Sequence, residues 1–246
     1  MTQLTSGPET LLADLHSSAA LVEKLAAPLD DAAVKAPSVL PGWTRGHVLA
    51  HVMGISDAMA RQVEYARRGE TVEVYDGGYE GRTARIELAA GHGADEHRTD
   101  VHTALTRALS AFDSLAPEEW AARVAYRDGV VLDGGLALWR ELVIHTSDLD
   151  LEYGPETWSK AFCLHLFDFL EARVPEDHHF VLQPLGLPPR TLGRGERGVV
   201  VSGMLTDIAA WLAGRKPSLD TLRASAAADD VALPPLLPWP SGVAAK

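Results

Sequence analysis

Two histidines lie four residues apart in the segment HVLAHV, at positions 47 and 51. An interval of four residues is just over one helical turn, so in a helix both imidazole rings lie on one face. Glu141 and His145, much later in the chain, have the same interval. Imidazole and carboxylate groups on facing helices are typical ligands of zinc or of non-haem iron.

These two pairs can combine into more than one kind of site. If both histidines of the first pair bound the same ion as Glu141 and His145, four protein ligands would leave no room for substrate. One histidine with Glu141 and His145 leaves an open position, as a catalytic metal requires. His51 lies one turn deeper in its helix than His47, so it is the better candidate. The alternative is that both pairs are ordinary helix-surface pairs.

Composition and charge narrow the class of protein. The chain has 246 residues, 46% of them hydrophobic, which is enough for one sizeable core or two smaller ones. Its formal net charge is -12, so we expect no nonspecific binding to nucleic acid or to an anionic membrane. We find no signal peptide and no apolar run of the roughly 20 residues that a bilayer requires. We therefore predict a soluble, cytoplasmic protein.

The chain contains one cysteine, Cys163, which excludes an internal disulfide. It lies in AFCLHLF among apolar neighbours, a setting typical of a buried and unreactive thiol. If the protein performs thiol chemistry, we expect another molecule to supply the thiol.

Hydrophobic periodicity predicts four helices that could position the candidate ligands. They cover residues 8–27, 45–69, 97–120 and 136–154, the second capped by Thr44. Residues 70–83 are polar and glycine-rich and are predicted to form a loop, and residues 122–135 an extended segment. Four helices with one or two long connections predict a four-helix bundle over residues 1–155.

The character of the chain changes after Pro155. We predict one more helix over residues 158–174, β-strands in 178–186 and 197–203, and a further helix over 204–216. A proline-rich tail, 233–246, is either extended over a surface or disordered. The prediction is therefore an α+β protein, with a helical bundle in residues 1–155 and a small α+β domain in 156–246.

Several of these segments carry a family resemblance. LPGWTRGHVLAHV and LWRELVIHTSDL resemble the mycothiol-dependent maleylpyruvate isomerase family, whose amino-terminal domain is a DinB-like four-helix bundle. GRTARIE resembles a loop motif of that family, and GVVVSGMLTDIAAWLAGR resembles the strand and helix that close its carboxy-terminal domain. The resemblance thus covers both parts of the chain.

The resemblance implies a set of site residues and cofactors. It implies that His51, Glu141 and His145 bind a catalytic divalent metal, typically zinc. It further implies that Arg215 and Arg82 are catalytic or substrate-binding residues, and that mycothiol is the thiol cofactor or cosubstrate. Asp148 follows three residues after His145 and could either orient that ligand or be an ordinary exposed carboxylate.

The resemblance also implies a reaction class. A thiolate would add to an electrophilic small molecule, as in the cis–trans isomerisation of a maleylpyruvate-type keto diacid, with arginine offsetting the enolate charge. The segment VEVYDGGYEG departs from the Met-Tyr-x-Ser pattern common at this place in the isomerases. A mycothiol S-transferase, including one in natural-product biosynthesis, is therefore an open alternative.

Two other classes of function fit the sequence. One is a metal-independent binding protein, in which the carboxy-terminal part holds an apolar ligand or lipid. The other is a DinB-like metal hydrolase of thiol conjugates, which would need no added thiol. For the main hypothesis and for these alternatives alike, we expect a monomer or a homodimer.

Overall fold

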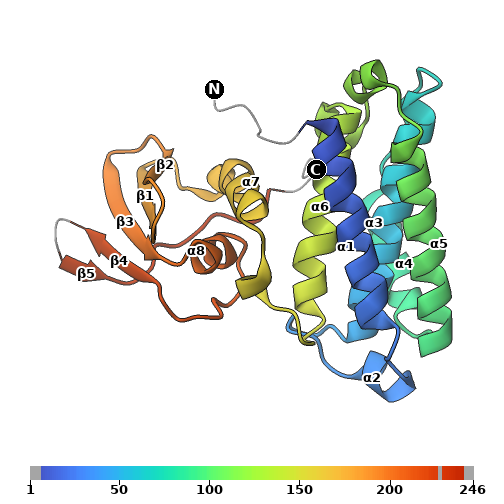
Figure 1. Cartoon of the computed structure of the whole chain (residues 1–246), viewed down its shortest axis with the longest axis horizontal. Helices are drawn as coiled ribbons and strands as arrows, with labels where there is room; N and C mark the ends of the chain where they lie inside the picture. Colours follow the sequence, from blue (N-terminus) through green and yellow to red (C-terminus); the bar gives the residue numbers. More distant parts are fainter. Residues whose placement is uncertain (1–6, 227–228, 241–246) are drawn as a thin grey trace. The chain divides into compact units, whose positions relative to one another are not determined.

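The structure is a computed structural model that describes residues 7–226 and 229–240 (Figure 1). It divides into two compact units, of which the first extends to Glu152 and the second begins at Tyr153. The first unit is helical, and the second combines helices with a β-sheet. The predicted α+β fold class, with a helical amino-terminal part, is confirmed.

The described part of the first unit contains six α-helices. Their bounds are α1 (Pro8–Ala26), α2 (Asp31–Lys35), α3 (Arg45–Ala66), α4 (Gly78–Ala89), α5 (Ala94–Asp113) and α6 (Val131–Asp148). The four long helices form a bundle in which α3 contacts α5 and α6, and α1 contacts the same two helices. The shorter helix α4 packs against α3. Helix α3 is thus surrounded on several sides.

The start of α3 is fixed by a reciprocal cap. The hydroxyl of Thr44 accepts a hydrogen bond from the backbone N–H of His47, and the backbone N–H of Thr44 donates to Nδ1 of His47. Such a capping box satisfies two backbone donors that a helix start leaves unpaired. It fixes the residue at which α3 begins, and the packing of α3 against α5 and α6 decides which side of the bundle His51 faces.

The predicted loop over residues 70–83 is wrong at its end, because α4 begins at Gly78. Gly77 and Gly78 have φ angles of +72° and +63°, which glycine adopts readily, so here the glycines form the turn that starts a helix. Within α4 only Ile86 and Ala89 are buried. A helix with so narrow an apolar face gives almost no periodic signal.

Other helix boundaries also differ from the prediction. Helix α6 begins at Val131, inside the segment predicted to be extended, because Asp133 accepts a hydrogen bond from the backbone of Val130 at 2.9 Å. Helix α5 ends at Asp113, and Pro117 starts a separate 3-10 turn. Short α2 was not predicted at all.

The second unit consists of two α-helices and a mixed β-sheet. Among the described residues its elements are α7 (Lys160–Leu170), β1 (His178–Pro184), β2 (Arg190–Gly193), β3 (Arg197–Gly203), α8 (Leu205–Leu212), β4 (Arg223–Ala226) and β5 (Asp229–Val231). The strand order is β2-β1-β3-β4-β5, and only β1 and β3 pair in parallel. The prediction located β1, β3 and both helices but missed the three strands of three or four residues.

The sheet and α8 share an apolar core. Phe180 and Leu182 of β1 pair in register with Val199 and Val201 of β3, and all four are buried. Ile208 of α8 is fully buried as well, and α8 contacts both strands. Alternating burial along each strand is what a sheet with one covered face produces.

The proline-rich end of the chain has no helix or strand over residues 232–240 and contacts the rest of the second unit. The backbone N–H of Leu237 donates to the carbonyl of Arg173 at 2.8 Å. The ring of Trp239 lies 5.7 Å from that of Phe169. Residues 241–246 of the predicted tail lie outside the described residues.

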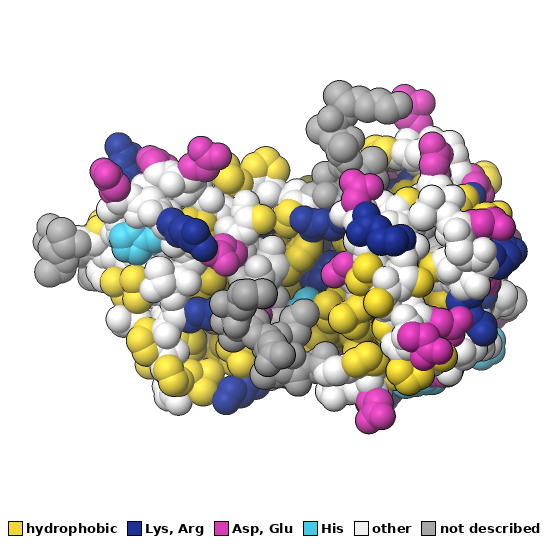
Figure 2. Space-filling model, turned by 90° about the horizontal axis from the view of Figure 1, so that it is seen from above, with side chains coloured by type: hydrophobic (Ala, Val, Ile, Leu, Met, Phe, Trp, Pro, Cys, Tyr) yellow, Lys and Arg dark blue, Asp and Glu magenta, His cyan; other side chains and the backbone are white. Residues whose placement is uncertain are grey.

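The surface is of mixed charge on the face that Figure 2 shows. Acidic and basic side chains are interspersed over it, although Asp and Glu outnumber Lys and Arg by 34 to 22 in the whole chain. No described helix combines the length and the apolar composition needed to cross a membrane.

Two adjacent glycines of α6 give a test of this packing. A Cβ atom on Gly135 would lie 3.0 Å from Leu11 Cδ2 and 3.2 Å from Phe112 Cε1, whereas one on Gly134 would meet only Met59 Sδ at 3.5 Å. Alanine gains about 1 kcal/mol of helix propensity over glycine at either position. We expect Gly134→Ala to raise the free energy of unfolding, and Gly135→Ala to be at least about 1 kcal/mol less stable than Gly134→Ala because of overpacking.

Urea unfolding of the two variants measures this difference. Equal stabilities would show that α6 does not approach α1 and α5 as closely as the structure indicates.

Candidate metal centre

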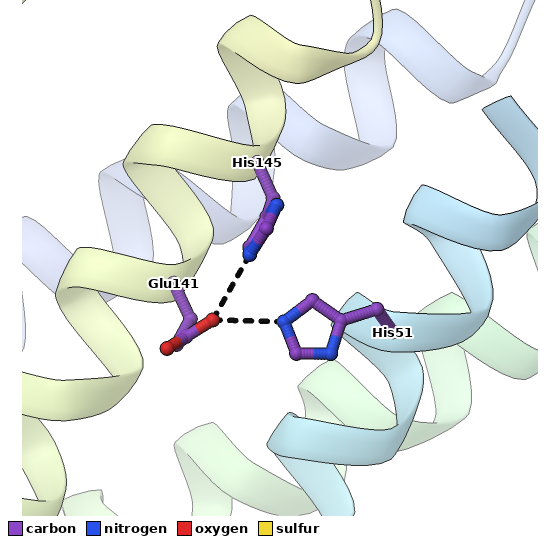
Figure 3. Close-up of side chains that lie close together, drawn as sticks. All are labelled: His51, Glu141 and His145. Atoms are coloured by element: carbon purple, nitrogen blue, oxygen red, sulfur yellow. Dashed lines mark hydrogen bonds and ion pairs between the residues drawn. The ribbon is translucent and has the colours of Figure 1, made fainter. Parts of the chain in front are cut away.

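His51 from α3 and the pair Glu141 and His145 from α6 meet on the facing sides of these two helices (Figure 3). Nε2 of His51 lies 2.8 Å from Oε2 of Glu141, and Nε2 of His145 lies 3.1 Å from the same oxygen. The two rings meet edge to face with centroids 4.3 Å apart. The three potential ligand atoms all lie within 4.8 Å of one another.

The charges of these groups depend on one another. Burial by itself raises the pKa of Glu141, but hydrogen bonds from His145 and His51 outweigh it and hold that pKa well below its ordinary value. Burial, followed by the charge of His145, lowers the pKa of His51 to about 4. At neutral pH the structure therefore presents a charged carboxylate beside a neutral His51 imidazole.

His145 has a second acidic neighbour, Asp148. Its Oδ2 lies 2.8 Å from Nδ1 of His145, and Asp148 is completely buried. Burial by itself lowers the pKa of His145, but the hydrogen bonds with Asp148 and Glu141 outweigh it and raise that pKa. Asp148 is thus not an exposed helix carboxylate, which was one of the two predicted alternatives.

Arg82 lies beside His51. Its Nη2 donates to Nδ1 of His51 at 3.1 Å, and its guanidinium lies 5.7 Å and 5.4 Å from the ring centres of Tyr75 and Tyr79. His51, Tyr75, Arg82 and Arg85 line one small pocket. Arg82 is a residue of helix α4 and not of a loop, so the helix fixes its direction.

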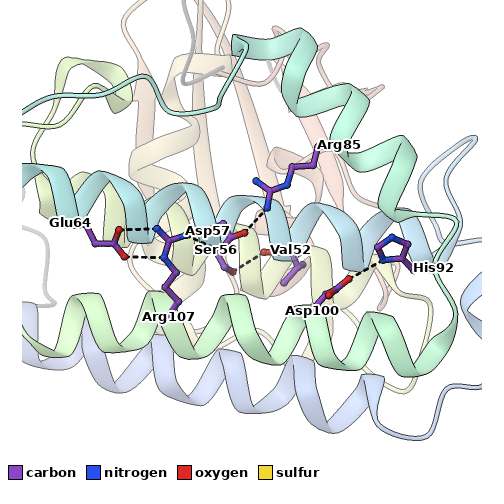
Figure 4. A network of polar contacts seen from close by, with 8 residues as sticks. All are labelled: Val52, Ser56, Asp57, Glu64, Arg85, His92, Asp100 and Arg107. Atoms are coloured by element: carbon purple, nitrogen blue, oxygen red, sulfur yellow. Dashed lines mark hydrogen bonds and ion pairs between the residues drawn. The ribbon is translucent and has the colours of Figure 1, made fainter.

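Arg85 links α4 to α3 through an ion pair. Its Nη2 donates to Asp57 of α3 at 2.7 Å, and Asp57 also pairs with Arg107 of α5 at 3.3 Å (Figure 4). Arg107 pairs further with Glu64 at 2.8 Å. Exposed ion pairs contribute little stability, so the packing of α4 on α3, which buries Ile86 and Ala89, positions Arg82 more than this network does.

His47 does not join the triad. Its Nδ1 accepts from the backbone of Thr44, its Nε2 lies 3.5 Å from Glu87, and its ring stacks on Trp43 with centroids 5.9 Å apart. The four-residue interval therefore puts both histidines on one side of α3, but only His51 lies within reach of α6.

Arg215 lies in the second unit, just after the end of α8. Its Nη1 donates to the backbone carbonyl of Ala213 at 3.0 Å, a contact expected of an arginine near a helix end. A role for Arg215 in chemistry stays a prediction.

Two polar residues of the pocket, Tyr75 and Arg85, were not among the predicted site residues. Burial, followed by the charge of Glu141, raises the pKa of Tyr75 to about 12, so its phenol is neutral. Arg85 follows Arg82 by three residues, an interval that places both on one face of a helix. That signal was present in GRTARIE but has meaning only once the segment is known to be helical.

A second group of possible ligands lies near the start of α5. His92 is 2.9 Å from Asp100 (Figure 4) and 3.5 Å from Glu96, and the three are partly or largely exposed. Exposed groups of this kind are common without a metal, so the triad between α3 and α6 is the candidate centre.

Comparisons with known proteins cover both units. A family model described as the mycothiol maleylpyruvate isomerase N-terminal domain matches residues 15–150, and one described as the MDMPI C-terminal domain matches residues 157–236. A search of curated proteins finds no match.

Two solved structures share the fold. A crystal structure of the mycothiol-dependent maleylpyruvate isomerase is 23% identical, with a TM-score of 0.81, covering 92% of this chain and 96% of that one. A histidine-to-alanine mutant of the mycothiol-dependent maleylpyruvate isomerase is 22% identical, with a TM-score of 0.80 and the same coverage.

The buried thiol gives a test of where sulfur chemistry can occur. Cys163 is fully buried in α7, and burial raises its pKa to about 12. A thiol with this pKa is roughly 0.01% thiolate at pH 8, against about a quarter for a free cysteine. We expect the native protein to react with a disulfide reagent such as DTNB at least about a thousandfold more slowly than the urea-unfolded chain. Fast labelling of the native protein would make Cys163 a candidate nucleophile after all.

Proposed function

Because the chain belongs to the mycothiol-dependent maleylpyruvate isomerase family, we propose that it is a metal-dependent enzyme that uses mycothiol as its thiol. The observation that carries the proposal is the convergence of His51, Glu141 and His145 on one point between α3 and α6. We propose zinc as the metal. We propose Arg82 and Arg215 as catalytic or substrate-binding residues.

The triad fits a catalytic divalent metal by its donor chemistry. Two imidazole nitrogens and one carboxylate oxygen are a common ligand set of catalytic zinc, which keeps a fourth position open. When bound in such a site, zinc lowers the pKa of a thiol at the open position and so supplies a thiolate near neutral pH.

Neighbouring groups favour the protonation states that metal ligands need. Hydrogen bonding keeps Glu141 ionised, and burial keeps His51 neutral, which are the states in which each can act as a ligand. Asp148, next to Nδ1 of His145, favours a proton on that nitrogen, so loss of the proton from Nε2 would leave a lone pair directed at the triad. We propose that Asp148 orients His145 in this way.

The thiol must come from a second molecule, since Cys163 is buried and weakly acidic. In the proposed isomerisation the sulfur adds to the carbon–carbon double bond of a maleylpyruvate-type keto diacid, and the electron pair moves to the keto oxygen as an enolate. Rotation about the new single bond and elimination of the thiolate then give the trans isomer.

The charges of the substrate need local cations, because the chain as a whole has a net charge of -12. Arg82 and Arg85 place two guanidinium groups at the pocket that His51 lines. A guanidinium binds a carboxylate through two parallel hydrogen bonds. We propose that Arg82 binds the substrate here, and that Arg215 contributes a further cation.

Zinc binding tests the triad. We expect one zinc ion per chain, and at least about a hundredfold weaker binding in His51→Ala, because one of three ligands is lost. His47→Gln is the matched control: glutamine at this position can keep the capping box with Thr44, so zinc affinity should stay that of the wild type.

Competition with a chromophoric chelator measures both affinities. Equal weakening in the two variants would mean that the site is misassigned, and a wild-type protein without zinc affinity would favour a metal-independent binding protein.

The reaction is tested by following maleylpyruvate with zinc-loaded protein, with and without mycothiol. We expect isomerisation only when mycothiol is present, because the chain has no accessible thiol of its own. Turnover of a thiol conjugate without added mycothiol would instead indicate a hydrolase. If maleylpyruvate is inert while mycothiol is transferred to another electrophile, the enzyme is an S-transferase.

A further inference from the structure

The two histidines of the triad have opposite kinds of partner on their outer nitrogens. Nδ1 of His145 faces a carboxylate oxygen of Asp148 at 2.8 Å. Nδ1 of His51 faces a guanidinium nitrogen of Arg82 at 3.1 Å. A carboxylate accepts hydrogen bonds, whereas a guanidinium can only donate them. The two rings are therefore held in opposite ways.

The contact with Arg82 decides which nitrogen of His51 carries the proton. A neutral imidazole has one N–H and one lone pair. Because Arg82 donates to Nδ1, the lone pair is on Nδ1 and the proton is on Nε2. This agrees with the other contact of the ring, in which Nε2 lies 2.8 Å from Oε2 of Glu141 and donates to it. Both hydrogen bonds of His51 are satisfied in this arrangement.

A metal at the triad requires the other tautomer. A ligand histidine that binds through Nε2 has its proton on Nδ1, and this N–H normally donates to an acceptor. At His145 a carboxylate oxygen of Asp148 lies 2.8 Å from Nδ1. At His51 the Nδ1–H would point at the N–H groups of Arg82, which leaves two donors facing each other.

We propose that Arg82 and a divalent metal compete for His51, so that metal binding breaks the contact between Arg82 and Nδ1 and frees the guanidinium. The inference rests on the metal site of the proposed function. Arg82 would stay near the pocket, since its guanidinium also lies close to the rings of Tyr75 and Tyr79. Binding of the metal thus releases a cation beside the pocket that His51 lines.

The test compares the zinc affinities of three variants in which the side chain at position 82 differs in charge and in hydrogen-bonding capacity. Arg82→Gln offers a carbonyl that can accept from Nδ1–H, Arg82→Met offers neither donor nor acceptor, and Arg82→Lys keeps a charged donor. We expect zinc to bind on the order of tenfold more tightly to Arg82→Gln than to wild type. Arg82→Met should be intermediate, and Arg82→Lys should resemble wild type.

Arg85→Gln is the matched charge control, because Arg85 lines the same pocket but pairs with Asp57 instead of His51. It removes the same charge and should change zinc affinity little. If Arg85→Gln tightens zinc binding as much as Arg82→Gln, or if Arg82→Gln equals Arg82→Met, the effect is charge alone and the inference is wrong.

Nitrogen-15 NMR of the histidine rings gives a second readout. In the metal-free protein, the signals of His51 should show a proton on Nε2, and in the zinc-loaded protein a proton on Nδ1. A metal-free His51 with its proton already on Nδ1 overturns the inference.

The zinc affinities also distinguish an error in the metal site from an error in the inference about Arg82. Zinc affinity that is unchanged in His51→Ala overturns the metal site and this inference together. Loss of zinc in His51→Ala combined with equal affinities of Arg82→Gln and wild type overturns the inference alone.

Discussion

The structure depends on how one carboxylate is held between two helices. Glu141 faces α3 from α6, where burial alone would favour its neutral form. Two imidazoles reverse that preference, since both approach the same carboxylate oxygen at hydrogen-bonding distance. A charge in such a place is stabilised only by partners with defined geometry. The relative position of α3 and α6 is therefore tied to the geometry of the candidate metal centre.

The surrounding elements serve this arrangement. The capping box at Thr44 sets where α3 begins, and the buried Asp148, about one turn beyond His145, supports the second ring. Helix α4 completes the surroundings by bringing Arg82 to the outer nitrogen of His51, and Arg85 of the same helix pairs with Asp57 of α3. The candidate ligands and their supporting groups thus come from three different helices.

The two supporting groups differ in their hydrogen-bonding role, and this difference affects how a metal could bind. His145 is backed by an acceptor, as expected of a metal ligand, whereas His51 is backed by a donor. In the structure Arg82 and Glu141 use both nitrogens of His51. A bound metal would compete with that arrangement for the ring. The proposed link between metal binding and Arg82 follows from this difference.

The amino-acid sequence by itself determined the long helices, the α+β class, the family and the intervals that pair Glu141 with His145. These features are local or periodic, so side-chain spacing records them. The sequence did not reveal α4, because its apolar face is limited to Ile86 and Ala89, and it left the burial of Asp148 open. It could not separate His47 from His51 except by an argument about coordination.

Only the tertiary structure decided which groups meet across helices. The contact between His51 and Arg82, the shared oxygen of Glu141 and the pocket residues Tyr75 and Arg85 all join positions far apart in the chain or on a helix that periodicity missed. Periodicity shows which face of a helix is buried. It does not show which side chain of the neighbouring helix lies opposite, because that depends on how the helices are rotated and packed against each other.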